Sequence, residues 1–195
     1  MRLIASACLT TIAVACAPAC AGFLPTAVID DFSGSAGLGF TRVAQNGATF
    51  SGDEGFLGGS GAGFQYLCDS PGYDASAYSG ISLKVSGSLG TGGLFLSVLG
   101  SDLGFVALDV DFGSTISNGY AWITFNQIDA AVGNDPGTIQ AALAQGTGFA
   151  AIGLSTTGNA SITVDDFQFG TSAVPGSGSL ALLAVAGLIT TRRRG

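Results

Sequence analysis

The chain contains no histidine, one tryptophan and one glutamate, Glu54, among its 195 residues. The lack of histidine excludes Ser-His and Cys-His catalytic pairs and imidazole metal ligands. Thirteen acidic residues outnumber six basic ones, and of the basic residues only Arg42 and Lys84 lie within residues 22–173, which therefore carry a net charge of −11. Such a charge repels nucleic acid and anionic lipid headgroups, so we expect no nucleic-acid partner.

The first 21 residues have the pattern of a secretory signal peptide. Arg2 precedes an apolar run that ends at Cys16, and Ala19 and Ala21 occupy the two positions that a signal peptidase reads. The run is shorter than the roughly 20 apolar residues of a membrane span. We therefore expect export and cleavage after Ala21 by signal peptidase. Acylation at Cys16 or Cys20, as in lipoproteins, is the alternative.

Residues 174–195 form a tail with three parts. Val174 and Pro175 open a spacer rich in Gly and Ser, an apolar stretch spans residues 180–189, and an arginine cluster follows. The cluster consists of Arg192, Arg193 and Arg194. As a helix the apolar stretch covers about 15–18 Å, against a hydrocarbon core of about 30 Å, so it is a poor permanent span. An ordinary buried C-terminal helix is the alternative.

This tail resembles the PEP-CTERM sorting signal of exported bacterial proteins, in which a Val-Pro motif precedes a short apolar helix and an arginine cluster. Val174 and Pro175 match that motif, whereas Gly176 and Ser177 replace its Glu and second Pro. The resemblance implies transient membrane insertion, removal of the tail by an exosortase-type transpeptidase, and delivery to the cell surface or extracellular matrix. A weak membrane anchor is the alternative.

Residues 22–173 are long enough for one domain with a single core. The 32 glycines and five prolines of the chain disfavour a helical bundle. Short apolar runs that alternate with period two, separated by Gly, Asn, Asp and Ser, predict an all-β sandwich or barrel. The ten predicted strands are Ala27–Phe32, Gly39–Val43, Ala48–Phe50, Gly63–Leu67, Ile81–Ser86, Leu94–Leu99, Gly104–Val110, Tyr120–Phe125, Ala150–Leu154 and Ala160–Phe169. We expect one short helix at Thr138–Gln145 and a loop at Gly55–Gly63.

Three segments of this domain resemble the galactose-binding-like jelly-roll fold. They are the opening Val28–Phe32, the stretch Asp74–Val85 and the closing Ala160–Phe169. Trp122 falls where that fold places a Trp-containing strand. The resemblance implies a jelly-roll β-sandwich and, because the superfamily includes carbohydrate-binding modules, a polysaccharide as a candidate ligand. A fold does not by itself define a function.

Two similar Asp-Asp-Phe motifs indicate a candidate cation site. Its residues are Asp30, Asp31, Asp165 and Asp166. If the first and last strands lie side by side with Phe32 and Phe167 inward, Asp30 and Asp165 share that inward direction. Neighbouring carboxylates repel unless a cation intervenes, and Ca²⁺ takes 6–8 oxygen ligands. Structural Ca²⁺ is therefore one hypothesis for these residues; the other is that each aspartate caps a turn or strand end.

Aromatic rings and carboxylates near loops are candidates for sugar binding, because rings stack on sugars and carboxylates accept hydrogen bonds from hydroxyl groups. The candidates in this chain are Tyr66, Asp69, Tyr73, Asp74 and Trp122. The alternative is that the aromatic residues fill the core or its rim.

The residue inventory does not favour catalysis. A glycosidase needs two placed carboxylates, and Glu54 has only Asp53 as an acidic neighbour in sequence. Cys68 lies outside the signal peptide but has neither a histidine partner nor a resolving cysteine. We therefore expect a non-catalytic protein of the cell surface or matrix, for which the jelly-roll resemblance implies a polysaccharide as candidate ligand. A purely structural envelope or matrix component and, last, a glycan-active enzyme are the alternatives.

Overall fold

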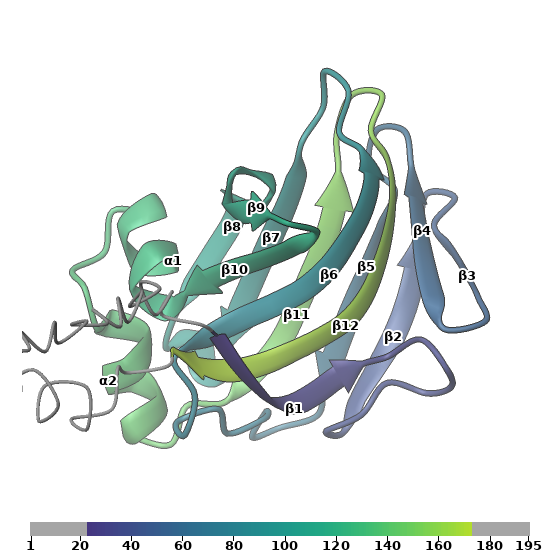
Figure 1. Ribbon diagram of the computed structural model, residues 1–195. Coiled ribbons are helices and arrows are strands. Elements are labelled where there is room, and N and C mark those ends of the chain that lie inside the picture. Colours follow the sequence, from purple (N-terminus) through teal and green to yellow (C-terminus); the bar gives the residue numbers. More distant parts are fainter. Residues whose placement is uncertain (1–22, 173–195) are drawn as a thin grey trace, which may run out of the picture. The chain divides into compact units, whose positions relative to one another are not determined.

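The computed structural model describes residues 23–172, whose strands pair antiparallel into two sheets (Figure 1). The larger sheet contains β1 (Phe23–Asp30), β3 (Thr49–Ser51), β4 (Glu54–Gly58), β6 (Gly80–Ser88), β9 (Ile116–Ser117), β10 (Tyr120–Thr124) and β12 (Ser161–Ser172). The smaller sheet contains β2 (Phe40–Gln45), β5 (Gly63–Cys68), β7 (Leu94–Gly100), β8 (Val106–Asp111) and β11 (Phe149–Thr156). The prediction of a mostly β domain is confirmed.

The strand order places segments that are far apart in the sequence side by side. The seven-stranded sheet has the order β3-β4-β12-β6-β10-β9, and β1 pairs with β12 off this path. The five-stranded sheet has the order β2-β5-β11-β7-β8. In Figure 1, β6 and β12 run beside each other as long curved strands. The first and last strands are therefore neighbours, as the hypothesis of a cation site at the two Asp-Asp-Phe motifs assumed.

The core lies between the two sheets. Residues alternate between buried and partly exposed along β7, and along β11 from Ala151 onward, which is the period-two pattern of strands that cover a core on one face. The ring of Tyr66 on β5 packs against Phe167 on β12 with 5.1 Å between centroids, so the contact crosses from one sheet to the other. Phe32 and Phe64 make a similar contact at 5.3 Å. The arrangement is a two-layer sandwich with an aromatic core.

Two α-helices, α1 (Phe125–Ala131) and α2 (Thr138–Ala144), lie at one end of the sandwich (Figure 1). The prediction of α2 is confirmed. The predicted strand that reached Phe125 instead ends at Thr124, because Thr124 and Gln127 form a reciprocal capping box that starts α1. Two short 3₁₀ helices, η1 (Ser101–Leu103) and η2 (Gly113–Thr115), flank β8.

The predicted loop at Gly55–Gly63 is wrong for its first half, which forms β4. Leu57 is buried and Phe56 is 39% exposed, so this short strand still alternates. A Cβ atom at Gly55 would meet the rings of Phe32 and Phe64, so glycine is required there by the close approach of core side chains. A glycine that permits such contact looks the same in the sequence as one that makes a loop.

The predicted signal peptide, the apolar C-terminal helix and the sorting residues Val174, Pro175 and Arg192–Arg194 lie outside the described residues. Within residues 23–172, neither helix has the length and apolar character needed to cross a membrane.

Candidate functional site

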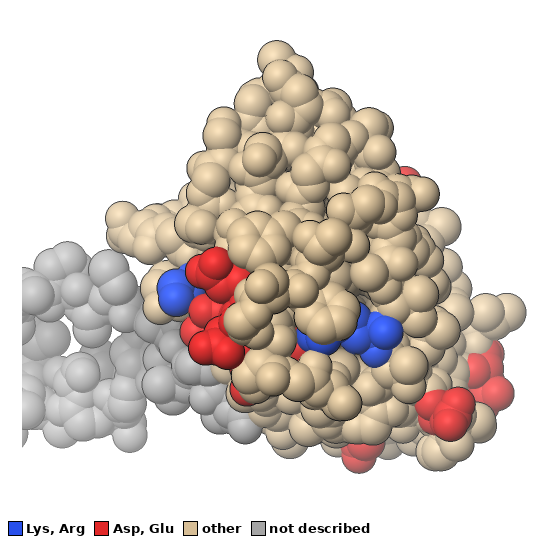
Figure 2. Space-filling model, turned by 90° about the vertical axis from the view of Figure 1, so that its right-hand side faces the viewer, with Lys and Arg blue, Asp and Glu red and all other residues tan. Residues whose placement is uncertain are grey.

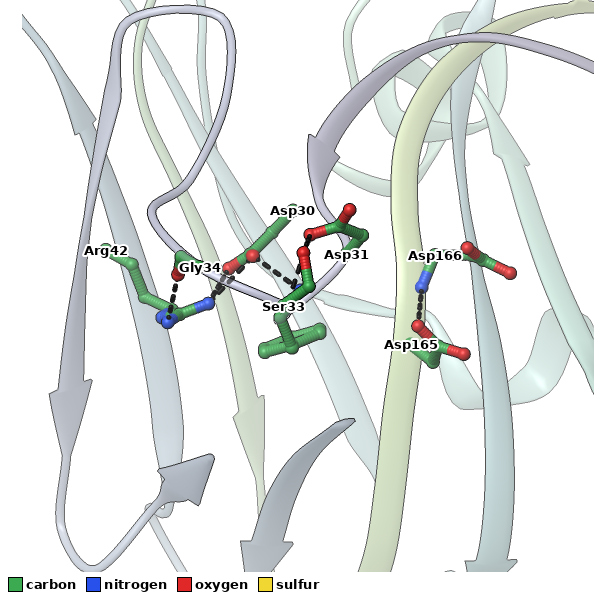
Figure 3. Close-up of polar contacts among 8 residues, drawn as sticks. Asp30, Asp31, Ser33, Gly34, Arg42, Asp165 and Asp166 are labelled. Atoms are coloured by element: carbon green, nitrogen blue, oxygen red, sulfur yellow. Dashed lines mark hydrogen bonds and ion pairs between the residues drawn. The ribbon is translucent and has the colours of Figure 1, made fainter. Parts of the chain in front are cut away.

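Asp30, the first predicted calcium ligand, already has a cation beside it. Its carboxylate accepts two hydrogen bonds from Nη1 of Arg42, at 2.7 and 2.6 Å, and one from the backbone N–H of Phe32 at 2.8 Å (Figure 3). The Asp30 side chain is fully buried and that of Arg42 is 6% exposed. Nη2 of Arg42 also donates to the carbonyl of Gly34, and its guanidinium stacks 3.9 Å from the centroid of the Phe50 ring. Asp30 is therefore part of a buried ion pair.

The other three aspartates of the candidate cation site do not share the environment of Asp30. Asp31 is exposed and accepts from the hydroxyl and the backbone N–H of Ser33, which lowers the pKa of its carboxyl. In Figure 3 Asp165 and Asp166 lie on β12, apart from the cluster of Asp30, Arg42 and Ser33. Asp165 accepts from Nζ of Lys84 at 3.2 Å and from the backbone N–H of Asp166 at 2.7 Å.

The expectation that Asp165 points inward with Phe167 is wrong, because a β-bulge interrupts β12. The register of β12 against β6 shifts between Asp165 and Gln168, and Asp166 has a φ of +48°. Val164 and Phe167, three positions apart, are both fully buried, which strict alternation would not allow. Asp165 is left beside the solvent-exposed Lys84.

Within residues 23–172 no group of three or more carboxylate or thiol residues is arranged to hold a metal ion. Asp31 makes the local turn contact that the alternative interpretation described. Structural calcium at these four aspartates stays a prediction.

Tyr66 is not available for stacking on a sugar, because it is fully buried in the core. The prediction that it is a ligand-binding residue is therefore wrong. Its hydroxyl group has no hydrogen-bond partner among the described residues. Burial, followed by the nearby negative charge of Asp30, raises the pKa of the phenol.

The predicted loop residues around Tyr73 serve local structure. Tyr73 is partly exposed and lies in a stack with Phe169 and Tyr78, with 5.2 and 5.7 Å between successive centroids. Burial and the adjacent Tyr78 hydroxyl raise the pKa of Tyr73. Asp74 accepts from the backbone N–H of Ser76 at 2.9 Å, which lowers the pKa of its carboxyl, and the carbonyl of Asp69 accepts from the N–H of Gly72.

Trp122, the remaining predicted ligand residue, is partly exposed on β10, where it pairs with Ser82 of β6. Two positions earlier on the same strand, Tyr120 is 54% exposed. Because alternate residues of a strand share a face, both aromatic rings belong to the outer face of the seven-stranded sheet.

Strand register brings a phenol, an ammonium group and two carboxylates into one row across that outer face. Tyr120 of β10 pairs with Lys84 of β6, and Lys84 pairs with Asp165 of β12. The register of β12 against β4 runs from Ser161–Gly58 to Val164–Gly55, and its continuation places Glu54 beside Asp165. We call the residues Tyr120, Lys84, Asp165 and Glu54 the polar row.

The polar row lines a cavity of about 240 Å³, together with Val85, Ser86, Asn118, Gly119 and Thr163. A second cavity of about 590 Å³ adjoins it along β6 and shares Val85, Ser86 and Gly119 with the first. We call the two cavities together the sheet groove; the polar row lines the first, and the second reaches the core residues Val85 and Ile162. Figure 2 shows blue atoms of the described cations at two places on one side of the molecule, one of them next to a group of red atoms.

The positive and negative charges of the polar row do not cancel. Lys84 is engaged by Asp165, whose hydrogen bond and charge raise the pKa of the lysine, with smaller contributions from Asp166 and Tyr120. The side chain of Glu54 makes no hydrogen bond or ion pair with any residue in the described part of the chain. The row therefore offers one carboxylate that is not neutralised by a neighbouring cation.

Sequence reasoning selected Trp122 and Asp165 but missed Tyr120 and Lys84, and it treated Glu54 as isolated. The sequence contains no direct signal that these three residues lie together. All three missed residues lie at strand ends or on exposed strand positions, and their proximity depends on which strands pair and in which register. No local motif encodes that pairing.

A further cavity of about 310 Å³ lies beside Arg42 and is lined also by Phe40 and Phe50. The guanidinium there is already committed to Asp30 and Gly34, so this cavity offers no free charge to a ligand.

No protein-family model, no curated protein and no solved structure matches the chain. The class that the described residues define is a two-layer antiparallel β-sandwich with an aromatic and polar groove on one outer face.

Proposed function

We propose that this is an exported bacterial protein of the cell surface or extracellular matrix whose sandwich binds a polysaccharide without catalysing a reaction. The observation that carries the proposal is the sheet groove, in which an exposed tyrosine lies beside hydrogen-bonding side chains of both signs. Aromatic rings supply apolar stacking area, and charged and hydroxyl groups fix the orientation of a ligand.

The strand order supports a jelly roll of the galactose-binding-like type. The eight central strands are β4, β5, β6, β7, β8, β10, β11 and β12. Counted in chain order, their sheets follow the sequences 1-8-3-6 and 2-7-4-5, given by β4-β12-β6-β10 and β5-β11-β7-β8. Two interlocked Greek keys produce this order, which is the wrapping of an eight-stranded jelly roll.

The two cavities of the sheet groove differ in size and lining. Its first cavity, about 240 Å³, is smaller than the roughly 300–1,000 Å³ of pockets for drug-sized molecules, and so it suits one sugar ring. The adjoining cavity of about 590 Å³ is lined by small and apolar residues, including Gly87, Ser88 and Gly90. A polysaccharide would therefore place one unit at the polar row and continue along β6.

A glycan array probed with the full chain tests this function. Reproducible binding to one class of glycan is expected, with loss of binding in Tyr120→Ala, because the Tyr120 side chain lines the cavity. Tyr73→Ala is a matched control, because Tyr73 lies in the stack with Phe169, away from the groove. A blank array with a chain that shows a cooperative unfolding transition would refute the proposal. Release of reducing sugar from a bound glycan would refute the non-catalytic role.

The terminal segments supply the proposed destination. The signal peptide and the tail that begins at Val174 imply export, transient membrane insertion and processing by signal peptidase and an exosortase-type transpeptidase. Mass spectrometry of the chain recovered from the surface of an exosortase-containing bacterium would test both cleavages. Recovery of a chain that still ends at Gly195 would contradict removal of the tail.

A purely structural role is the second candidate, and the outer face of the five-stranded sheet favours it. Apolar side chains are exposed there at Val43, Leu67 and Leu108, with exposed fractions of 39%, 42% and 67%. In a strongly acidic domain, such uncharged surface is where copies of the chain could associate without charge repulsion. A blank glycan array combined with reversible multimers in light scattering would favour this role.

A further inference from the structure

The sheet groove also carries information about which glycan it would take, an inference that depends on the proposed polysaccharide-binding function. We propose that the groove binds a glycan of 2-amino sugars whose amine is free and protonated, with the ammonium group held by Glu54.

The first step is the charge of the cavity. Three ionisable groups with charge at neutral pH line it, two carboxylates and one ammonium group, from Glu54, Asp165 and Lys84. Lys84 and Asp165 compensate each other at 3.2 Å. One negative charge remains, on the exposed carboxylate of Glu54. A ligand that brings a single positive charge to this position complements the cavity, whereas a uronate or sulfate group meets repulsion.

The second step is the field of the whole domain. Its 13 acidic residues lie entirely within residues 30–166, where Arg42 and Lys84 are the basic residues and Arg42 is buried against Asp30. A negative surface raises the local concentration of cationic ligands and lowers that of anionic ones. Anionic polysaccharides are therefore disfavoured before contact, and a polycationic one is attracted.

The third step is the ring surface. Tyr120 is 54% exposed and shares the polar row with the carboxylates, so a sugar ring stacked on it lies within the same cavity. The face of an aromatic ring also attracts a cation, because its quadrupole is negative there. A ligand with a flat saturated ring and an attached ammonium group meets both features. A lysine side chain supplies the ammonium group but has no ring to stack.

The fourth step concerns the uncharged polar residues that line the same cavity. Ser86, Asn118 and Thr163 carry hydroxyl and amide groups that can both donate and accept hydrogen bonds. These groups match sugar hydroxyls, which also donate and accept. They leave the charged contact to Glu54 alone.

Binding of two oligosaccharides to the full chain tests the inference, a β-1,4-linked glucosamine hexamer and its fully N-acetylated counterpart, measured by calorimetry at pH 6 and low salt. The expected result is a preference of about tenfold for the free amine, the effect of one added charge-assisted hydrogen bond. The preference should shrink as salt is added, because the charges are exposed.

Two variants separate the role of Glu54 from general attraction. Glu54→Gln removes the charge and keeps the shape, so it should remove most of the preference and leave only the part due to the charge of the whole domain, while the acetylated hexamer still binds. Asp53→Asn removes the same charge from the adjacent residue, which does not line the cavity, and should leave the preference intact. A loss of preference in both variants would overturn the assignment of Glu54.

The remaining outcomes are also decisive. Equal affinity for both hexamers, or binding of a different glycan class only, overturns this inference and leaves the polysaccharide-binding function standing. A lysine hexapeptide that binds as tightly as the glucosamine hexamer overturns it too, because the groove would then recognise charge without a ring. Binding of no glycan at all by a chain that unfolds cooperatively refutes the function and the inference together.

Discussion

Replacement of Arg42 by methionine should be among the most destabilising single changes in the domain. Methionine keeps much of the apolar stem but leaves the fully buried carboxylate of Asp30 without a cation. Breaking a buried ion pair from one side costs about 3–5 kcal/mol, because an uncompensated charge remains out of water. A domain of ordinary stability, about 5–15 kcal/mol, would still show a transition that can be measured.

Lys84→Met provides the matched control within the same molecule. Its ion pair with Asp165 is longer, 3.2 Å, and the two side chains are 48% and 18% exposed. Exposed pairs contribute little to stability because water and salt screen them, so this variant should unfold nearly as the parent does. Urea unfolding followed by the fluorescence of the single tryptophan, Trp122, measures both free energies.

A double variant, Asp30→Asn with Arg42→Met, tests the physical reason. Asparagine removes the buried charge and keeps an oxygen that can accept from the backbone N–H of Phe32, at 2.8 Å in the parent chain. The double variant should therefore be more stable than Arg42→Met alone by at least about 1 kcal/mol. The reasoning is refuted if Arg42→Met lowers the free energy of unfolding no more than Lys84→Met does. It is also refuted if adding Asp30→Asn to Arg42→Met restores none of the lost stability.

Four other outcomes are expected from the described contacts. Thr124→Ala removes the capping hydroxyl of α1 and should cost about 1 kcal/mol in urea unfolding, with normal stability contradicting the cap. Gly92→Ala drives a methyl group against the carbonyl of Thr157 and should cost about 1–3 kcal/mol, whereas Gly58→Ala meets no atom within 4 Å and should stay within about 0.5 kcal/mol of the parent. The pKa of the Asp74 carboxyl is lowered in the folded chain, so its contribution to folding stability is complete above about pH 4 and is lost as the pH falls through the folded-state pKa. The difference in stability between the parent and Asp74→Ala should therefore vanish when both are unfolded in acid. Structural calcium at the four aspartates requires a lower Tm in EDTA than in calcium, and identical melting curves would contradict it.

The fold class could be predicted because it depends on local periodicity. Alternation along Leu94–Leu99 directly predicted β7, and Thr138–Gln145 had the composition of a helix that became α2. The failures at Glu54–Gly58 and at Phe125 have different causes. The first depends on ring contacts that glycine permits across the core, and no local pattern reports them. The second was readable, since Thr124 and Gln127 have the spacing of a capping box.

The candidate site was harder to predict, because its residues meet only through strand register. Alternation correctly suggested that Asp30 faces the core, but it could not identify Arg42 as the cation that accompanies it there. It also placed Asp165 on the wrong face, because one inserted residue reverses the direction of everything that follows in a strand. Tyr120 stands in an unremarkable segment, and its importance follows from its pairing with Lys84.

The bulge in β12 connects the fold to the proposed function. β12 pairs with β4 up to Val164 and with β1 from Phe167 onward, so its partner changes at Asp165 and Asp166. The extra residue allows Phe167 to return to the core while Asp165 stays on the outer face beside Lys84. Glu54 is the first residue of β4, directly after the turn from β3, and it lines the same cavity. The irregularity that defeats sequence-based prediction therefore lets β12 supply Asp165 to the polar row and Phe167 to the core, and binding chemistry on this sandwich should depend on it.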